Sequence, residues 1–361
     1  MADISENLAW SLTDTSERAV RPASVKPLRE LRRRARQLRD EISYSVVAYE
    51  SCRENLLIGR LRTARVFTEQ MVDGRGNTVV TAKRTFDRVS LPHLGNQVLR
   101  MGVAANMGLD SADIPYAAER GVNLWLYGRS FGKATVPLKA LLAHEREKHV
   151  VVMLGTFVLT PRGARRTVEK ARRELGIDCV DLFLMPWLGC TSRFSPAIQD
   201  ELVEMREEGI VRGVGTSIHD RQRAGRLAAN SILDAFMLRY NAKHPDAEQD
   251  VFPHLATRDP IVISYTATSW KQLLKCLKGI DMSPWPGADT GATMPPLTAA
   301  LCYRFVLNSP HVHATWTGPA NREQLDENLA ALEAGPLSVE EEAWVREYGK
   351  QVKAKRKRDY V

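Results

Sequence analysis

The segment VDLFLMPWLGCTSRFSPAIQDELVEMREEGIVRGVGT, residues 180–216, decides the fold of this chain. It contains two short runs rich in apolar residues, 180–185 and 211–216. Between them lies a stretch, 196–208, whose apolar residues recur at helical spacing. Mostly apolar runs that alternate with amphipathic helices are typical of parallel strands covered by helices on both faces. The segment therefore predicts a strand–helix–strand unit.

The same unit recurs along the chain from about residue 97. Eight apolar runs lie at 98–104, 123–127, 150–154, 180–185, 211–216, 234–238, 261–265 and 312–317. Stretches with helical spacing lie at 111–120, 136–147, 163–175, 196–208, 220–229, 246–256, 296–307 and 321–333. Eight such units favour an α/β fold of the (β/α)₈ TIM barrel type over an open sheet. No GxGxxG pattern follows any of the runs, which also argues against an open dinucleotide-binding sheet.

The chain divides by pattern into residues 1–85, an N-terminal arm and helical extension, and 86–361, the barrel with a C-terminal helix. In the extension, apolar residues at helical spacing predict a helix from Pro27 that continues in pieces to about Met71. A turn cluster at 73–77 and a short strand at 78–81 are expected next. The C-terminal helix is expected from Ser338 to about Lys350, since Ser338 and Glu341 form a capping-box pattern.

Composition excludes several classes of protein. The five cysteines never form a CxxC pair, which argues against a disulfide framework, a structural zinc site or an iron–sulfur cluster. No apolar run reaches the roughly 18 residues of a membrane span, and the N-terminus lacks the pattern of a secretion signal. We therefore expect a cytoplasmic protein without a membrane or metal partner.

The net charge of +8 is concentrated in an arginine-rich stretch at 29–39 and in the tail at 353–358. Such stretches are more often solvated surface than sites for nucleic acid, and no nucleic-acid motif accompanies them. A nucleic-acid partner is not expected. In a barrel of this type, ligands and substrates bind at the C-terminal ends of the strands, which we call the mouth.

Four segments resemble the aldo/keto reductase family. EEGIVRGVGTS (207–217) is similar to the family pattern KxGKIRxIGVSN, and LGIDCVDLFL (175–184) to LxxDYIDLYxxH. AERGVN (118–123) is similar to the start of AxxxGxNxxDTAxxYG, and GPANREQLDEN (318–328) to GxxxxxQLxEN. The matches occur in the family's order over roughly residues 97–350. The resemblance implies an NADP- or NAD-dependent oxidoreductase that transfers hydride to a carbonyl group.

The resemblance also places the family's catalytic aspartate, tyrosine, lysine and histidine on other residue types. These four positions are occupied here by Leu126, Phe131, Thr156 (or the preceding Gly155) and Pro186. Phenylalanine has no proton to donate, so the standard acid–base chemistry should be lost. This predicts a pseudoenzyme with respect to standard carbonyl reduction.

The family's cofactor contacts are retained only in part. Ser217 stands at the position that contacts the nicotinamide amide, but the asparagine that follows it in the family is Ile218 here. In the segment that holds the adenosine half of the cofactor, the resemblance singles out Gly318, Gln324, Glu327 and Asn328.

Two other functions remain open from the sequence. The mouth could carry different chemistry on a small-molecule ligand, with Tyr127, Arg129, Tyr240 and His244 as the candidate groups; His219 and Cys190 also follow strands. Alternatively, the barrel could be a non-catalytic scaffold or regulatory subunit. In that case residues 27–71 would bind a protein partner or a second copy of the chain.

Overall fold

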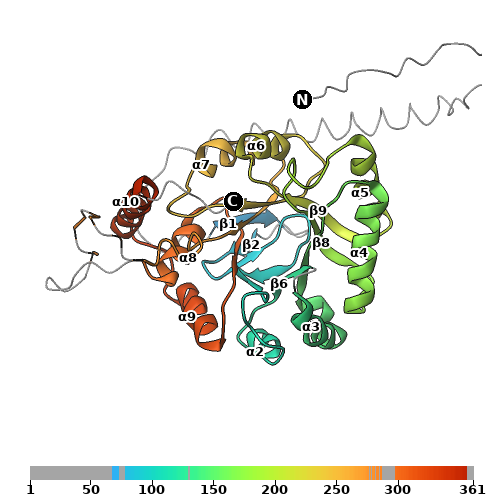
Figure 1. Ribbon diagram of the computed structural model, residues 1–361, viewed down its shortest axis with the longest axis horizontal. Coiled ribbons are helices and arrows are strands. Elements are labelled where there is room, and N and C mark those ends of the chain that lie inside the picture. Colours follow the sequence, from blue (N-terminus) through green and yellow to red (C-terminus); the bar gives the residue numbers. More distant parts are fainter. Residues whose placement is uncertain are drawn as a thin grey trace, which may run out of the picture. The chain divides into compact units, whose positions relative to one another are not determined.

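Eight parallel strands close into a barrel, as the sequence predicts (Figure 1). The computed structural model describes residues 67–72, 78–128, 131–275, 277, 279–280, 282–283, 285–286 and 297–355. The barrel strands are β5 (Met101–Ala104), β6 (Leu124–Gly128), β7 (Val150–Leu154), β8 (Val180–Met185), β9 (Val211–Ser217), β10 (Ala235–Arg239), β11 (Ile261–Tyr265) and β12 (Ala314–Thr317). Each strand pairs with the next along the chain, and β12 closes the ring by pairing with β5.

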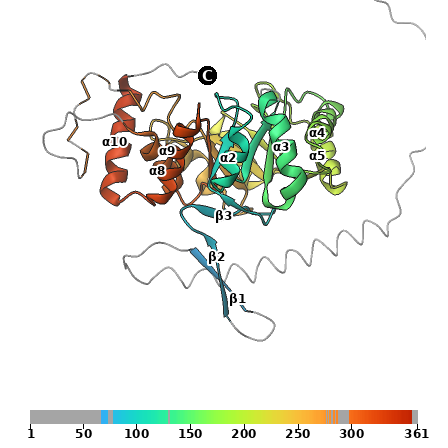
Figure 2. The ribbon, with the colours of Figure 1, turned by 90° about the horizontal axis from the view of Figure 1, so that it is seen from below.

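Helices surround the barrel and connect its strands (Figures 1 and 2). They are α2 (Asp113–Glu119), α3 (Gly132–Glu145), α4 (Pro161–Leu175), α5 (Pro196–Glu207), α6 (Arg221–Ala229), α7 (Ala247–Asp250), α8 (Ala299–Asn308), α9 (Arg322–Glu333) and α10 (Val339–Lys355), with short 3₁₀ turns η2 (Arg146–Lys148) and η3 (Phe252–His254). Several begin at residues that favour a helix start, with proline in the first turn of α4 and α5 and a capping side chain before α4, α6, α8 and α9. Within the described part of the chain, no helix is both long enough and apolar enough to span a bilayer.

The apolar run 98–104 forms two strands rather than one. Its first part is β4 (Gln97–Leu99), which pairs antiparallel with β3 (Arg88–Ser90), and only β5 enters the barrel. The strands separate at Arg100, whose buried guanidinium donates hydrogen bonds to main-chain carbonyls, including 2.8 Å bonds to those of Leu307 and Val312. Periodicity alone does not reveal this break, because the apolar pattern continues through it.

The small sheet at the N-terminal end of the barrel has the order β1-β2-β3-β4 (Figure 2). β2 (Thr78–Arg84) contains the predicted strand at 78–81. The helix expected to reach Met71 is wrong at its end, because Phe67–Val72 forms strand β1, paired antiparallel with β2. Residues 27–66, which hold the rest of that expected helix, and the end of the basic tail at 356–361 lie outside the described residues.

Successive side chains along each strand point alternately into the barrel and towards the surrounding helices. A Cβ atom added to Gly102 would lie within 3 Å of the Trp316 and Leu124 side chains, so these two residues point inward. On β6 the intervening residues point outward, where Trp125 donates to His149 Nδ1 at 3.1 Å and Tyr127 donates to Glu174 at 2.9 Å. The interior is filled by side chains, and any functional group must therefore lie at an end of the barrel.

Candidate functional site at the barrel mouth

The four positions where the family carries its catalytic groups lie at the mouth. Leu126 follows Leu124 on the inward face of β6 and is 9% exposed, and Phe131 is a buried residue at the start of α3. Thr156 follows β7 and Pro186 follows β8. Gly155 cannot take a larger side chain without movement, because a Cβ there would be 2.9 Å from the Phe183 ring. Thr156 is therefore the better match to the family's lysine position.

Tyr127 and Tyr240 do not face the mouth, which corrects the expectation that they could act there. The Tyr127 hydroxyl contacts Glu174 and Thr135 on the outer helices, and burial raises its pKa to about 12. The Tyr240 hydroxyl donates to Glu248 at 2.6 Å, and its ring packs on Phe305 with centroids 5.7 Å apart. Tyr127 occupies an outward position on β6, and Tyr240 directly follows β10; both side chains connect the barrel to the helices.

His244 lies in a tight turn after β10 rather than at an open site. Its main-chain N–H donates to the carbonyl and side-chain oxygens of Asn241 at 2.9 and 3.0 Å, and its side chain is 4% exposed. Helix α10 packs directly on the turn, since a Cβ at Gly349 would be 2.1 Å from the Ala242 carbonyl oxygen. The packing leaves His244 almost inaccessible. Arg129, the fourth candidate, lies outside the described residues.

A different group of polar side chains gathers at the mouth. Tyr265, the last residue of β11, places its hydroxyl 3.2 Å from Nδ1 of His219, in the loop after β9. The rings are nearly perpendicular at 84°, with centroids 6.1 Å apart, and His219 in turn lies 6.2 Å from the Trp187 ring. Ser217 and Arg239 complete the group and come from the C-terminal ends of β9 and β10. Ser217, His219, Arg239 and Tyr265 together are called the mouth cluster below.

Burial and a neighbouring cation set the protonation of this cluster. Burial raises the pKa of Tyr265 to about 12, against a smaller lowering by Arg239 and Ser217. Burial and then Arg239 lower the pKa of His219, so this imidazole is neutral at pH 7. Ser217 is 1% exposed, and its hydroxyl makes no hydrogen bond of ordinary geometry, although it lies near enough to Tyr265 to influence the phenol. A buried hydroxyl without a partner is unusual in a folded protein and therefore marks this position.

The expected adenosine contacts lie around the start of α9. Asn328 is buried and donates to Thr317 Oγ1 at 2.8 Å, and Gln324 accepts from the N–H of Ala320 at 3.0 Å. Gly318 lies against Met107, because a Cβ there would be 2.7 Å from Met107 Cγ. Glu327 is exposed on α9. Asn328 and Gln324 thus already have partners within the protein.

Arg322 is the cation nearest to these positions along α9. Its Nε donates to Asp113 Oδ1 at 2.7 Å, and its guanidinium lies 4.7 Å from the centroid of the Tyr116 ring. Both partners belong to α2, so the Arg322 side chain links α9 to α2.

Comparison with known proteins agrees with this architecture. The aldo/keto reductase family model matches residues 102–275. A curated relative, the NADH-specific methylglyoxal reductase of Escherichia coli K12, is 24% identical over 201 residues, which cover 48% of this chain and 60% of the relative. The matched region thus spans less than two thirds of that relative's length.

The solved structures show the same fold. An aldo-keto reductase from Bacillus halodurans is 17% identical with a TM-score of 0.60, covering 73% of this chain and 95% of that chain. The glycerol dehydrogenase of Gluconobacter oxydans is 19% identical with a TM-score of 0.57, covering 75% and 96%. A Klebsiella pneumoniae aldo-keto reductase in complex with NADPH is 20% identical with a TM-score of 0.54, covering 71% and 93%. The family model, the curated relative and the solved structures all point to the aldo/keto reductase superfamily.

The sequence identifies Ser217 and places Arg239 within the polar stretch at the end of β10, but it does not single out Tyr265. Arg239 and Tyr265 are the last residues of their strands, in the runs AFMLR and IVISY. Their position at a strand end was a usable signal, because inward-facing strand ends of such barrels point into the mouth. His219 is a candidate by residue type, but its partner Tyr265 lies 46 positions away in sequence.

Cys190, noted for its position after β8, is exposed rather than buried. Cys302, in contrast, is buried within α8, and burial raises the pKa of its thiol. Among the described residues, no group of three or more histidine, cysteine, aspartate or glutamate side chains is arranged to hold a metal ion.

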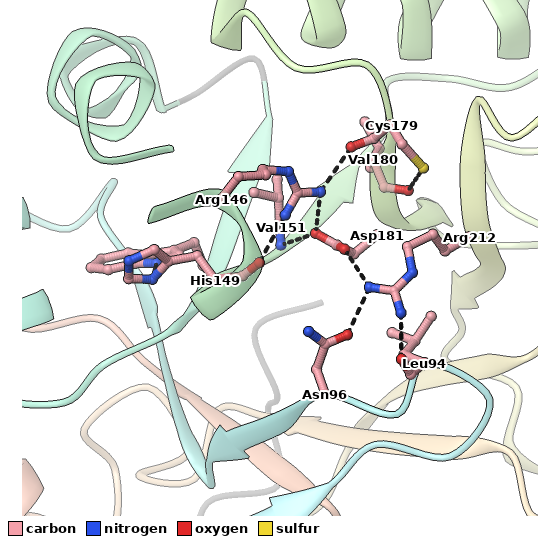
Figure 3. A network of polar contacts seen from close by, with 10 residues as sticks. Leu94, Asn96, Arg146, His149, Val151, Cys179, Val180, Asp181 and Arg212 are labelled. Carbon is pink, nitrogen blue, oxygen red and sulfur yellow. Dashed lines mark hydrogen bonds and ion pairs between the residues drawn. The ribbon is translucent and has the colours of Figure 1, made fainter. Parts of the chain in front are cut away.

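The opposite end of the barrel, its base, carries a different kind of polar network (Figure 3). Asp181, which is 1% exposed, accepts hydrogen bonds from Arg146 at 2.9 Å, Arg212 at 2.9 Å and the Val151 N–H at 2.8 Å. A cavity of about 560 Å³ adjoins this network, and another of about 700 Å³ lies under β3 near His313. We assign both cavities to the structural base, because sites in (β/α)₈ barrels form at the mouth and because the Asp181 network is already satisfied by protein groups.

Proposed function

We propose that this barrel binds a nicotinamide dinucleotide, NADH in preference to NADPH, with the nicotinamide amide at Ser217. We further propose that it does not reduce carbonyl compounds by the family's four-residue acid–base arrangement. The observation that carries the first part is the buried Ser217 hydroxyl, which has no hydrogen-bond partner of ordinary geometry. A carboxamide group would supply that partner.

The residues at the mouth fit the nicotinamide end of the cofactor in part. Ser217 and Tyr265 offer hydroxyl groups at the inward-facing ends of β9 and β11, whereas the buried Ile218 cannot replace an asparagine amide. One side-chain contact to the amide is therefore expected where the family makes two. A bound reduced nicotinamide would supply a hydride, and the protein's part would be to hold the ring near the mouth cluster.

The preference for NADH follows from the charges around α9. A 2′-phosphate needs a cationic partner. The positions at which the family contacts this phosphate are occupied here by the uncharged residues Gly318, Pro319 and Gln324. Arg322 would have to give up its contact with Asp113 to reach a phosphate. The acidic Glu323 and Glu327 lie on the same helix and would disfavour added negative charge. The NADH specificity in the name of the E. coli relative supports the same direction.

Titration of the purified protein with NADH and NADPH tests this proposal, followed by nucleotide fluorescence and by the shift in Tm. We expect micromolar binding of NADH and binding of NADPH that is weaker by about tenfold or more, since loss of a charged contact costs about 1.5–3 kcal/mol. Ser217→Ala should weaken the binding of NADH and of NADPH by the same factor, because both nucleotides carry the nicotinamide amide. Absence of binding by either nucleotide at millimolar concentration would reject the proposal.

The loss of standard reduction rests on the apolar residues at the mouth. Phe131 has no proton to transfer, and Leu126 cannot orient a lysine. In the nucleotide-saturated protein, reduction of methylglyoxal should therefore lack the acid–base contribution of about 10²–10⁴-fold. Phe131→Tyr alone should not restore it, because a phenol without the aspartate and lysine keeps a high pKa. A rate typical of an enzyme in the unaltered protein, with normal dependence on pH, would contradict this part.

A further inference from the structure

We propose that two copies of this chain associate through the flank that α4 and α5 form, as a reversible and salt-sensitive dimer with two-fold symmetry. These helices lie side by side on the barrel (Figures 1 and 2). The proposed function does not use this surface. The basis of the inference is that opposite charges are separated onto the two neighbouring helices, each as a row of exposed side chains.

Helix α4 carries exposed basic side chains along one face. Their spacing of three or four residues places them above one another on the helix surface, and together they are called the basic stripe: Arg162, Arg166, Lys170 and Arg173. Lys170 Nζ lies 3.5 Å from Glu174 Oε1, whereas the three arginines make no ion pair with any residue that the structure describes. Cations one turn apart repel each other and weaken a helix. The stability of α4 therefore does not explain the stripe.

Helix α5 carries exposed acidic side chains in a similar arrangement. Asp200, Glu204 and Glu207 follow one another at spacings of four and three residues and are called the acidic stripe. Glu204 Oε2 lies 3.8 Å from Arg165 Nη2. Among the described residues, Asp200 and Glu207 have no cationic partner. The flank thus exposes charges of both signs that lie next to each other but are largely unpaired.

Contacts of Arg165 show how α4 and α5 are aligned along their lengths. Its guanidinium contacts glutamates on successive turns of α5, within residues 201–208. Arg166, the next residue of α4, is therefore level with Glu204, in the middle of that range. The helices of a (β/α)₈ barrel run in the same direction, and four residues advance about 6 Å along each. One turn earlier, the next members of the two stripes are consequently level as well.

A second copy of the chain can pair these charges. A two-fold axis parallel to the helices, between α4 and α5, places the basic stripe of each copy on the acidic stripe of the other at the same height. Arg162 then faces Asp200 of the second copy, and Arg166 faces Glu204 of the second copy. An axis across the helices would instead place like charges together. The charge pattern therefore selects one symmetric arrangement, in which the same surface serves both copies.

A polyanion fits this flank less well than a second copy does. A nucleic acid or an anionic lipid surface that covered both helices would be attracted by the basic stripe and repelled by the acidic stripe beside it. The second copy presents both signs of charge, each opposite its complement. Electrostatic complementarity of this kind mainly sets the orientation and the partner.

The size of the flank indicates a weak dimer. Helix α5 has 12 residues, so it is about 18 Å long, and two neighbouring helices are about 20 Å wide. Such a face buries roughly 400 Å² on each copy, at the low end for a specific complex. Leu159 and Phe157, which are 50% and 65% exposed, precede α4, and their loop is joined to the loop before α5 by the Arg193 N–H and the Val158 carbonyl at 2.8 Å. They add apolar surface at one end, and we expect a Kd of roughly 10–100 µM.

Sedimentation velocity of the full chain over a range of concentrations tests the proposal. We expect dimers in about 0.05 M salt and a Kd at least about tenfold weaker in about 0.5 M salt, because the screening length falls from roughly 14 Å to roughly 4 Å. A chain that remains monomeric at about 200 µM in the low-salt buffer, above the expected Kd, would overturn the proposal. A dimer that is insensitive to salt would also overturn it.

Charge reversals locate the interface. Arg162→Glu/Arg166→Glu and Asp200→Arg/Glu204→Arg should each abolish dimers of the variant alone, because like charges then face each other. An equimolar mixture of the two variants should form dimers again, since every altered residue in the mixed pair faces an opposite charge. Failure of the mixture to associate, with both variants folded by far-UV circular dichroism and Tm, would contradict the paired arrangement.

A control variant separates local pairing from overall charge. Lys350→Glu/Lys353→Glu changes the net charge by the same amount as the α4 variant, and both lysines are exposed on α10, on the other side of the barrel (Figure 1). This variant should dimerise like the unaltered chain. Dimers of undiminished affinity in both stripe variants would place the interface elsewhere and overturn the proposal. A monomeric chain that binds a single-stranded oligonucleotide, with binding lost in the α4 variant, would assign the basic stripe to a polyanion and overturn it too.

Discussion

The two ends of this barrel differ in whether their buried polar groups have hydrogen-bond partners. At the base, the buried carboxylate of Asp181 is matched by two arginines and a main-chain N–H (Figure 3). At the mouth, Ser217 is equally buried but has no hydrogen-bond partner of ordinary geometry, and tryptophans lie exposed in strained conformations. The comparison indicates that the base is arranged for stability and the mouth for a ligand, because unsatisfied and strained groups lower stability unless something binds them.

The largest effect on stability is expected at the base, for Arg100→Met. Arg100 is 1% exposed and donates to the carbonyls of Phe86, Leu307, Val312 and His313 at 3.2, 2.8, 2.8 and 3.0 Å. Methionine fills much of the space but removes these four hydrogen bonds, so the free energy of unfolding should fall by about 3–4 kcal/mol. Urea denaturation measures the change. Arg120→Met, at a half-exposed ion pair with Asp326, is the control and should change stability by less than about 0.5 kcal/mol.

Asp181→Asn should reduce the free energy of unfolding by about 2–3 kcal/mol. The amide keeps the shape of the side chain but removes the charge that holds Arg146 and Arg212 together. Asp178→Asn, an exposed residue that lines the same cavity, should be nearly neutral in the same denaturation experiment. If the two variants were equally stable, the base network would not have the structural role given to it above.

His313 should make stability depend on pH. Burial, followed by Arg84 and Arg100, lowers its pKa to about 3, and its Nδ1 accepts from the Val262 N–H at 3.1 Å. The unfolded chain takes up a proton at this residue below about pH 6.5, whereas the folded protein does not, so stability falls as the pH drops from 6.5 towards 3. Between pH 7.5 and 5 the unaltered protein should lose about 2 kcal/mol more than His313→Gln, by urea denaturation at each pH. Identical losses would contradict the neutral buried state of this imidazole.

The smallest effect on stability is expected at the mouth, for Ser217→Ala. Removal of a buried hydroxyl that lacks a partner should change the free energy of unfolding by less than about 0.5 kcal/mol. Ser264→Ala is the matched control: this serine is also buried, but its hydroxyl donates to Thr315 Oγ1 at 2.8 Å, so about 1 kcal/mol should be lost. If Ser217→Ala were the more destabilising of the two, the contrast between mouth and base would fail for this group.

Much of the fold could be predicted because the strands of a parallel barrel are buried on both faces. Runs such as VVVML and IVISY coincide with β7 and β11, since each is mostly apolar and bordered by a helix pattern. The break at Arg100 and strand β1 were missed. Both depend on partners distant in sequence, namely carbonyls more than 200 positions from Arg100 and strand β2 for β1.

The candidate site was predicted less well than the fold. Residue type and position near a strand end indicate Tyr127 and Tyr240 as site residues. Both face the outer helices instead, where their hydroxyl groups donate hydrogen bonds to Glu174 and Glu248. A shift of one position along a strand reverses the direction of a side chain, and the pattern of apolar residues does not reveal which side is inward when both sides are buried. Tyr265, on an inward position, was the tyrosine that reached the mouth.

The sequence by itself determined the barrel, the family that it resembles and the residue types at that family's catalytic positions, because local patterns and motif order carry that information. Only the tertiary structure decided which polar groups meet. The contact of Tyr265 with His219, the unpartnered hydroxyl of Ser217 and the exposure of Trp187 and Trp270 arise where separate strands end at one rim. Such contacts depend on strand register and on side-chain direction, and neither can be determined from the sequence of a single segment.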